Sequence, residues 1–144
     1  MMRTAPIAVL LSLCATPAFA GPDGDALTKA DLIGTKWALD CTKPASATNY
    51  HLSYSVAASG VPVETLRTTA GADKVRELRN VQSISDEWLL YSLTDTDHEV
   101  VNILTTRKGG RKKSWWSVGK DGALYILNGK FLDSGEPPWF EQCK

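Results

Sequence analysis

The chain has 144 residues, and its 16 basic side chains are balanced by 16 acidic ones. This length is enough for one domain of ordinary size and too short for two. The balanced charge argues against a general nucleic-acid-binding protein, because such proteins carry an excess of positive charge. Any electrostatic interaction with a partner must therefore be confined to a local patch.

The first twenty residues have the order of a secretory signal peptide. Arg3 precedes an apolar run at 7–13, and residues 18–20 form the small-x-small step that signal peptidases cleave. The apolar run is shorter than the roughly 20 residues that a transmembrane helix needs. We therefore expect residues 1–20 to be removed before Gly21, leaving a periplasmic or secreted protein without a transmembrane segment.

Two of the three cysteines lie outside this leader. Cys14 lies within it and follows Leu13, whereas a lipoprotein leader has a small residue before the acylated cysteine. In an oxidising compartment the remaining pair, Cys41 and Cys143, is expected to form a disulfide. Closing a loop of about a hundred residues would stabilise the fold by at most ~4 to 5 kcal/mol in the chain-entropy description. Neither cysteine has the spacing or neighbouring histidine of a metal site.

One short helix is expected before the strands. Asp25 could cap the N-terminus of a helix over 26–33, which Gly34 would end.

Most of the chain after this helix alternates apolar and polar residues, as half-buried strands do. The pattern is clearest at 50–57, where apolar side chains occupy every second position. Segment 75–84 is the least regular, because its first residues could also form a helical turn. The expected strands are 36–41, 50–57, 61–68, 75–84, 88–94, 98–107, 111–118, 123–127 and 130–132.

Tight turns join these strands. Gly109-Gly110 and Asn128-Gly129 are two-residue hairpin signals, and a polar turn is expected at 95–97. Strands joined in this way form an antiparallel up-and-down meander, whose two edges stay exposed unless it closes on itself. We expect an all-β fold of about eight strands over 21–144, closed into a single barrel domain with a short N-terminal helix. A two-sheet sandwich is the alternative.

The segment Leu32-Ile33-Gly34-Thr35-Lys36-Trp37 resembles the start of calycin barrels, the superfamily of lipocalins and avidins. In those barrels a glycine and a tryptophan open the first strand, and the resemblance implies that Trp37 packs across a closed end. The stretch 34–39 also resembles small periplasmic inhibitors of secreted metalloproteases, which are disulfide-bearing barrels. That resemblance implies an inhibitory N-terminal segment at 21–27.

The most unusual local feature is a cluster of cations around the Gly109-Gly110 turn, followed by two indoles. Clustered cations repel one another unless an anion or acidic group lies nearby, and Arg and Trp often carry binding energy at interfaces. The cluster predicts a binding site for a ligand or an anionic surface; the alternative is a solvated tip that Asp86 and Glu87 neutralise. Adjacent strand residues face opposite ways, so we expect one indole inside and one outside. The candidate binding residues are Arg107, Lys108, Arg111, Lys112, Lys113, Trp115 and Trp116.

The sequence carries no recognisable catalytic, cofactor or metal motif. His51 and His98 lie on different expected strands, and the chain has neither G-x-S-x-G nor H-E-x-x-H. Ser117 and Lys120 have S-x-x-K spacing but fall where a strand meets a turn. The acidic segment 95–99 lacks the glycine and distal glutamate of an EF-hand loop.

These observations favour a small exported binding module that recognises a small ligand or an anionic surface, without a cofactor and without nucleic acid. Three alternatives remain open: an inhibitor of a secreted protease or other hydrolase, a cofactor-free barrel enzyme, and a structural envelope protein. The enzyme would need an acid/base pair inside the barrel. Two ionisable groups within hydrogen-bond distance in the interior would therefore favour it.

Overall fold

The computed structural model of the protein describes residues 21–69, 72–94, 100–133 and 135–144. The expected leader at 1–20 and the expected turn and acidic segment at 95–99 lie outside the described residues. The side chains of residues 72 and 100 are likewise not described.

Helix α1 (Pro22–Lys29) is present but begins and ends earlier than the predicted 26–33. Pro22 occupies the first turn, where its missing N–H group is not needed, and Gly21 rather than Asp25 is the N-cap. Asp25 therefore lies inside the first turn, where an acidic side chain interacts favourably with the helix dipole. The chain leaves the helix at Ala30, and Asp31 adopts a positive φ of 51°.

In the described part of the chain, ten strands follow the helix, and the meander from β1 to β9 is confirmed, since each pairs antiparallel with the next. The least regular segment, 75–84, is part of a strand and not a helical turn. The strands are β1 (Lys36–Ala38), β2 (His51–Val56), β3 (Pro62–Thr69), β4 (Ala72–Ser85), β5 (Trp88–Thr94), β6 (Val100–Lys108), β7 (Arg111–Gly119), β8 (Leu124–Leu127), β9 (Lys130–Phe131) and β10 (Phe140–Cys143).

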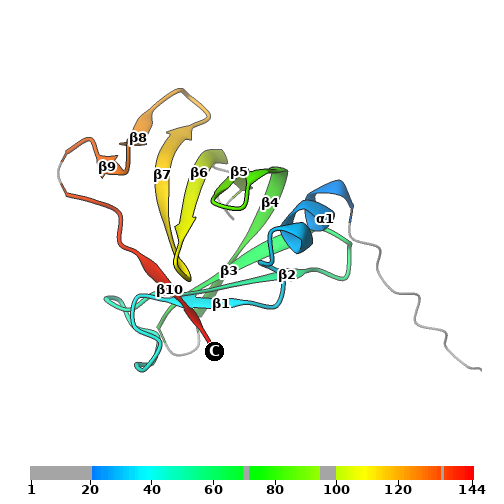
Figure 1. Cartoon of the computed structure of the whole chain (residues 1–144), viewed down its shortest axis with the longest axis horizontal. Helices are drawn as coiled ribbons and strands as arrows, with labels where there is room; N and C mark the ends of the chain where they lie inside the picture. Colours follow the sequence, from blue (N-terminus) through cyan, green and yellow to red (C-terminus); the bar gives the residue numbers. More distant parts are fainter. Residues whose placement is uncertain (1–20, 70–71, 95–99, 134) are drawn as a thin grey trace, which may run out of the picture.

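Strand β10, which the sequence did not reveal, closes the barrel. It pairs with β1, where Trp37 faces Gln142, and with the first residues of β7, where Lys112 faces Phe140. Among the described strands, β1 to β7 and β10 thus form a closed ring of eight, and the sandwich alternative is excluded. The β8–β9 hairpin continues from the other half of β7 (Figure 1).

The predicted disulfide between Cys41 and Cys143 is confirmed, with a Cα–Cα distance of 5.4 Å. Cys143 pairs with Lys36 of β1, so the covalent link lies beside the seam that β10 makes with β1. The bridge spans 102 residues of sequence, and a loop of that length corresponds to a stabilisation of ~4 to 5 kcal/mol at most.

The core joins apolar side chains of α1 and the segment after it to those of the barrel strands. Leu27 of the helix is fully buried, and with Leu32 it joins a cluster that includes Trp37, Leu78 and Leu89. The Asp23 side chain accepts a hydrogen bond from the backbone N–H of Val81 at 2.8 Å, which fixes the helix on β4. Figure 1 shows α1 beside β3 and β4.

Candidate functional site

The five cations around the β6–β7 turn do not form one exposed patch, which corrects the expectation of a cationic hairpin tip. Gly109 and Gly110 make the predicted turn with φ values of 58° and 71°. Lys108 and Arg111 are exposed and Arg107 is half-buried. Two further members, Lys112 and Lys113, are only 4% and 7% exposed. The physical reason is that Lys112 points into the barrel, where it contacts Tyr54, and that the segment before β10 covers Lys113.

Arg107 joins the hairpin to the helix and to the neighbouring turn. Its guanidinium donates to the main-chain carbonyl of Ala30 and, at 2.7 Å, to that of Asp86. Its own backbone N–H donates to the carbonyl of Glu87 at 2.8 Å. The acidic turn does lie next to the hairpin, but it contacts Arg107 through backbone carbonyls. Arg107 therefore has a structural role.

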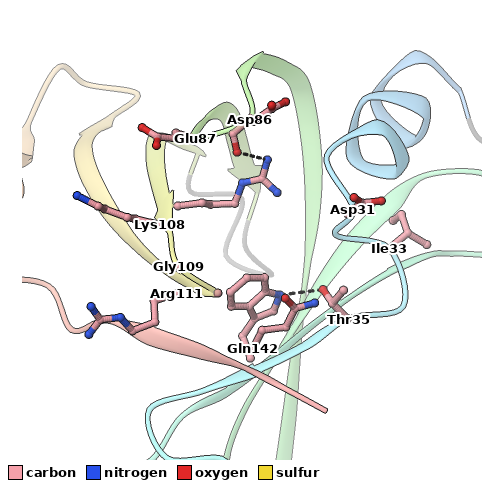
Figure 2. Close-up of a pocket in the computed structure, with 12 residues that line it drawn as sticks. Asp31, Ile33, Thr35, Asp86, Glu87, Lys108, Gly109, Arg111 and Gln142 are labelled. Carbon is pink, nitrogen blue, oxygen red and sulfur yellow. Dashed lines mark hydrogen bonds between the residues drawn. The ribbon is translucent and has the colours of Figure 1, made fainter.

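An open groove of about 640 Å³ lies between this hairpin and the segment after α1; we call it the outer groove (Figure 2). Its cationic side chains, Arg107, Lys108 and Arg111, are matched by acidic ones. Asp31 and Glu87 belong to the same lining as these cations. A groove of mixed charge has no strong preference for an anionic partner.

Lys113 and Arg111 lie against the segment that leads into β10. Lys113 Nζ is 3.1 Å from Glu136 Oε2 and 5.1 Å from the ring centroid of Trp139. The guanidinium of Arg111 lies 5.3 Å from the same ring. Trp139 thus lies over the barrel wall between two cations.

A β-bulge places both adjacent indoles on the same face, which corrects the expectation of one inside and one outside. Trp116 pairs with Leu104, while Trp115 is skipped by a register shift. The Trp115 ring meets Trp88 edge to face, with centroids 5.6 Å apart. On β5, Trp88 and Leu90 alternate with the buried Leu89 and therefore face outward. Leu104 is opposite Leu90, so Trp116, which pairs with Leu104, and Trp115, which contacts Trp88, lie on this outer face. Neither indole lines the outer groove or the cavity described next.

A second hollow, the interior cavity, has a volume of about 370 Å³ and lies within the barrel beside β7. Phe131 and Tyr50 line it and are 38% and 37% exposed, so they lie at its opening. Pro137 and Pro138 border it as well, where the chain passes from the β8–β9 hairpin to β10. Its walls are mainly apolar and include Leu52, Leu66, Leu93, Ile103, Ile126 and Phe140.

A chain of polar side chains borders this cavity. Glu64 is 1% exposed; its Oε2 accepts a hydrogen bond from the Tyr54 hydroxyl at 2.6 Å, and its Oε1 pairs with Arg76. Lys112 Nζ donates to the Tyr54 hydroxyl from the other side. Strand register explains the cluster, because Tyr54 is opposite Glu64 and Glu64 is opposite Arg76. Directly opposed residues on paired strands share one face of the sheet.

The environment shifts the pKa values of Lys112, Tyr54 and Tyr91, the last of which also lines the cavity. Burial lowers the pKa of Lys112 to about 7, an effect that nearby Glu64 opposes and Arg76 reinforces. Burial also raises the pKa of Tyr54 well above its ordinary value, and the Glu64 carboxylate adds to this. For Tyr91, burial raises the pKa to about 12. The tyrosines therefore remain protonated at neutral pH, whereas a large fraction of Lys112 is a neutral amine.

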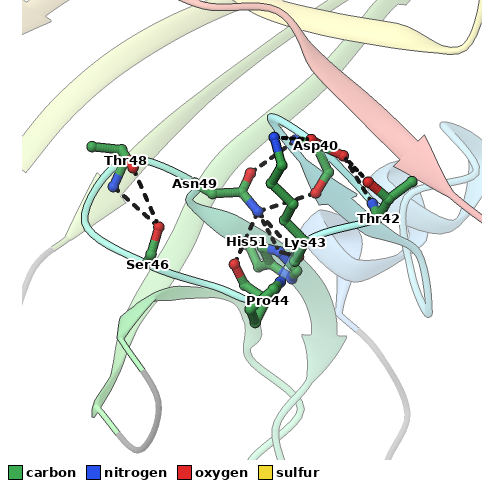
Figure 3. Close-up of polar contacts among 8 residues, drawn as sticks. All are labelled: Asp40, Thr42, Lys43, Pro44, Ser46, Thr48, Asn49 and His51. Carbon is green, nitrogen blue, oxygen red and sulfur yellow. Dashed lines mark hydrogen bonds and ion pairs between the residues drawn. The ribbon is translucent and has the colours of Figure 1, made fainter.

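His51 helps to hold the loop between β1 and β2 and does not belong to the polar side chains that border the cavity. The buried Asn49 amide donates to three loop carbonyls, those of Asp40, Lys43 and Pro44, at 3.0 to 3.1 Å (Figure 3). Its Oδ1 accepts from the Asp40 N–H at 2.8 Å. His51 Nε2 lies 3.0 Å from the Lys43 carbonyl within the same arrangement. The histidine thus helps to hold the loop closed.

Among the described residues there is no cluster of histidine, cysteine and acidic side chains that could ligate a metal ion. No helix in that part of the chain has the length and hydrophobicity needed to span a membrane. Comparisons of the chain with protein-family models, with curated proteins and with solved structures found no match.

Sequence reasoning assigned Lys112 to the right hairpin but missed the groups around it. Glu64, Arg76 and Tyr54 were not singled out. The sequence did contain a signal for these residues. Glu64 is two positions from Leu66 and Arg76 is two positions from Leu78, so each charged side chain faces the same side of its strand as an apolar one. Charged residues at inward positions of two neighbouring strands indicate a buried ion pair.

Proposed function

We propose that this protein is an exported barrel that binds a small, largely apolar ligand with one polar group in the interior cavity. The main support is the cavity itself, which has apolar walls, a row of hydrogen-bonded polar side chains at one side and aromatic residues at its opening. Its volume of about 370 Å³ lies within the range of small-molecule sites. A long-range disulfide and a leader-like N-terminus support a periplasmic or secreted location.

The alternative of an anionic surface as partner has less support. Only two members of the cationic cluster, Lys108 and Arg111, are exposed, and the groove that they line also contains acidic side chains. The resemblance to calycin barrels, including the inhibitory segment that it implies at 21–27, remains a prediction.

Ligand binding in the interior can be tested by filling the cavity. Ser114 lines it, so Ser114→Phe places a large ring in the space that a ligand would occupy. We expect this variant to weaken the binding of decanol, a neutral amphipathic probe, by about tenfold or more, because overlap with the ring costs at least ~1.4 kcal/mol. Isothermal titration calorimetry measures the affinity.

The matched control is Ser55→Phe, which makes the same change at an exposed position of β2. It should bind decanol like the unmodified protein. Equal binding by both variants would show that the probe lies outside the cavity and would contradict the proposal, as would the absence of any binding to the unmodified protein.

A further inference from the structure

We propose that Lys112 captures the aldehyde or ketone group of a ligand as a reversible Schiff base inside the interior cavity. The inference rests on the proposed function, because it takes the interior cavity as the ligand site. It adds a covalent step and a chemical class of ligand: an apolar molecule that ends in a carbonyl group.

The position of Lys112 is that of an enclosed reactive amine. The side chain lines the cavity and is almost completely buried. Its Nζ contacts the Tyr54 hydroxyl and lies 4.1 Å from the Tyr54 ring centroid and 5.2 Å from that of Trp37. A carbonyl carbon that reaches this side of the cavity therefore meets the amine in a site shielded from bulk water.

Burial favours the neutral form of Lys112; of the nearby charges, Glu64 favours the ammonium form, whereas Arg76 and Arg107 favour the neutral one. Glu64 already pairs with Arg76 and accepts the hydrogen bond of Tyr54. A buried ammonium group with no carboxylate of its own is costly, whereas a neutral amine needs no counterion. Burial lowers the pKa of Lys112 to about 7, while an ordinary lysine, near 10.4, is almost entirely protonated at neutral pH. A desolvated lysine of this kind is the form that reacts with carbonyl compounds.

The neighbouring groups can move the protons that the reaction requires. The Lys112 nitrogen attacks the carbonyl carbon, and the carbonyl electron pair moves to its oxygen. The proton released by the nitrogen passes to the Tyr54 oxygen as Tyr54 passes its own to Glu64, following the hydrogen bonds already present. Glu64, which lines the cavity, returns this first proton to the carbinolamine oxygen. The second N–H proton follows the same route to that oxygen, which then leaves as water as the C=N bond forms. One amine and one carbonyl thus give one imine and one water, with no oxidant or reductant.

Reductive trapping tests the proposal. Purified protein is incubated at pH 7 with decanal and sodium cyanoborohydride, which reduces an imine to a stable secondary amine. Peptide mass spectrometry then locates each lysine that carries a decyl group. We expect labelling of Lys112 to be at least about tenfold faster than that of the exposed Lys108, since far more of the buried amine is neutral at this pH. Its rate should rise with pH around 7 and then level off.

Variants separate the reaction from folding. Lys112→Met and Lys112→Arg should lose the selective label while keeping the circular dichroism spectrum of the unmodified protein, and Lys120→Arg, at an exposed lysine outside the cavity, should keep the label. Tyr54→Phe retains the ring but not the hydroxyl, so it should slow labelling and alter its pH profile. This last readout would not change if Tyr54 served only to support the fold.

The outcomes are distinguishable. If decanol binds but decanal labels Lys112 no faster than Lys108, the Schiff base is refuted and the ligand site stands. If the unmodified protein binds neither probe, both the site and the covalent step are refuted.

Discussion

At the scale of single residues, the most consequential group is the Lys112 amine, which the barrel buries beside an ion pair that is already complete. Its lowered pKa has a thermodynamic counterpart in stability. Between pH 7 and about 10 the unfolded chain holds a proton on this lysine that the folded protein releases. In that window the free energy of unfolding therefore rises with pH. Below pH 7 both the folded and the unfolded protein hold the proton, and the stabilisation gained from the neutral amine is absent.

We accordingly expect the free energy of unfolding to increase from pH 7 to pH 9 by up to about 1.4 kcal/mol per pH unit from Lys112 alone. Urea unfolding followed by circular dichroism measures this slope. Lys112→Met should flatten it and should leave stability at pH 7 equal or higher, because a methionine in this place has no charge to desolvate. A slope that survives the substitution would place the titrating group elsewhere.

A second single-residue prediction concerns Asn49, whose amide satisfies carbonyls of the loop between β1 and β2. Asn49→Ala removes these donors and should lower the free energy of unfolding by about 1 to 3 kcal/mol. Thr48→Ala, at the exposed neighbouring residue, is the control and should have a much smaller effect. Denaturant titration compares the two; equal losses would mean that the Asn49 contacts contribute little.

At the scale of elements, alternation and turn dipeptides predicted strands β2 to β9 well, because both are local properties of the sequence. β5 begins and ends where the pattern placed it, at Trp88 and Thr94. The bulge at Trp115 could not be anticipated, since it depends on the register with β6. The helix was misplaced because Asp25 is a plausible cap by type, whereas Pro22 fixed the first turn earlier.

The β8–β9 hairpin offers a test of a turn that is fixed by two constraints at once. Gly129 has a φ of +71°, and a Cβ there would lie 3.0 Å from the Trp115 ring. Gly122 has a similar φ of +84° but open space around it. We expect Gly129→Ala to cost about 1 kcal/mol more in unfolding free energy than Gly122→Ala, since only the former adds a steric clash to backbone strain. Equal costs would show that Trp115 moves aside freely.

At the scale of the whole molecule, sequence reasoning reached the barrel and its disulfide but not the strand that closes it. β10 is short and follows two prolines, so no alternation marks it, and it is stabilised by partners on β1 and β7. The interior site was equally hidden, because Tyr54, Glu64 and Arg76 come together only when the register of three strands is known. The closing strand and the interior site therefore depend on pairing between strands, which the local alternation of residues does not reveal.

Removing the disulfide should weaken the whole barrel, because the bridge ties β1 to β10. We expect the double variant Cys41→Ala with Cys143→Ala to lose about 2 to 5 kcal/mol of unfolding free energy. Reducing agent should produce a similar loss in the unmodified protein and none in the double variant. If reduction left the unmodified protein equally stable, the bridge would contribute nothing beyond the strand pairing beside it.

Pairing of β1 with β10 also constrains when the molecule can fold. The ring is completed by contacts between residues about a hundred positions apart, so the barrel cannot close until β10 is available to pair with β1. Contacts of such long range slow folding. The nascent protein therefore has an extended period in which chaperones can hold it and aggregation competes with the native state.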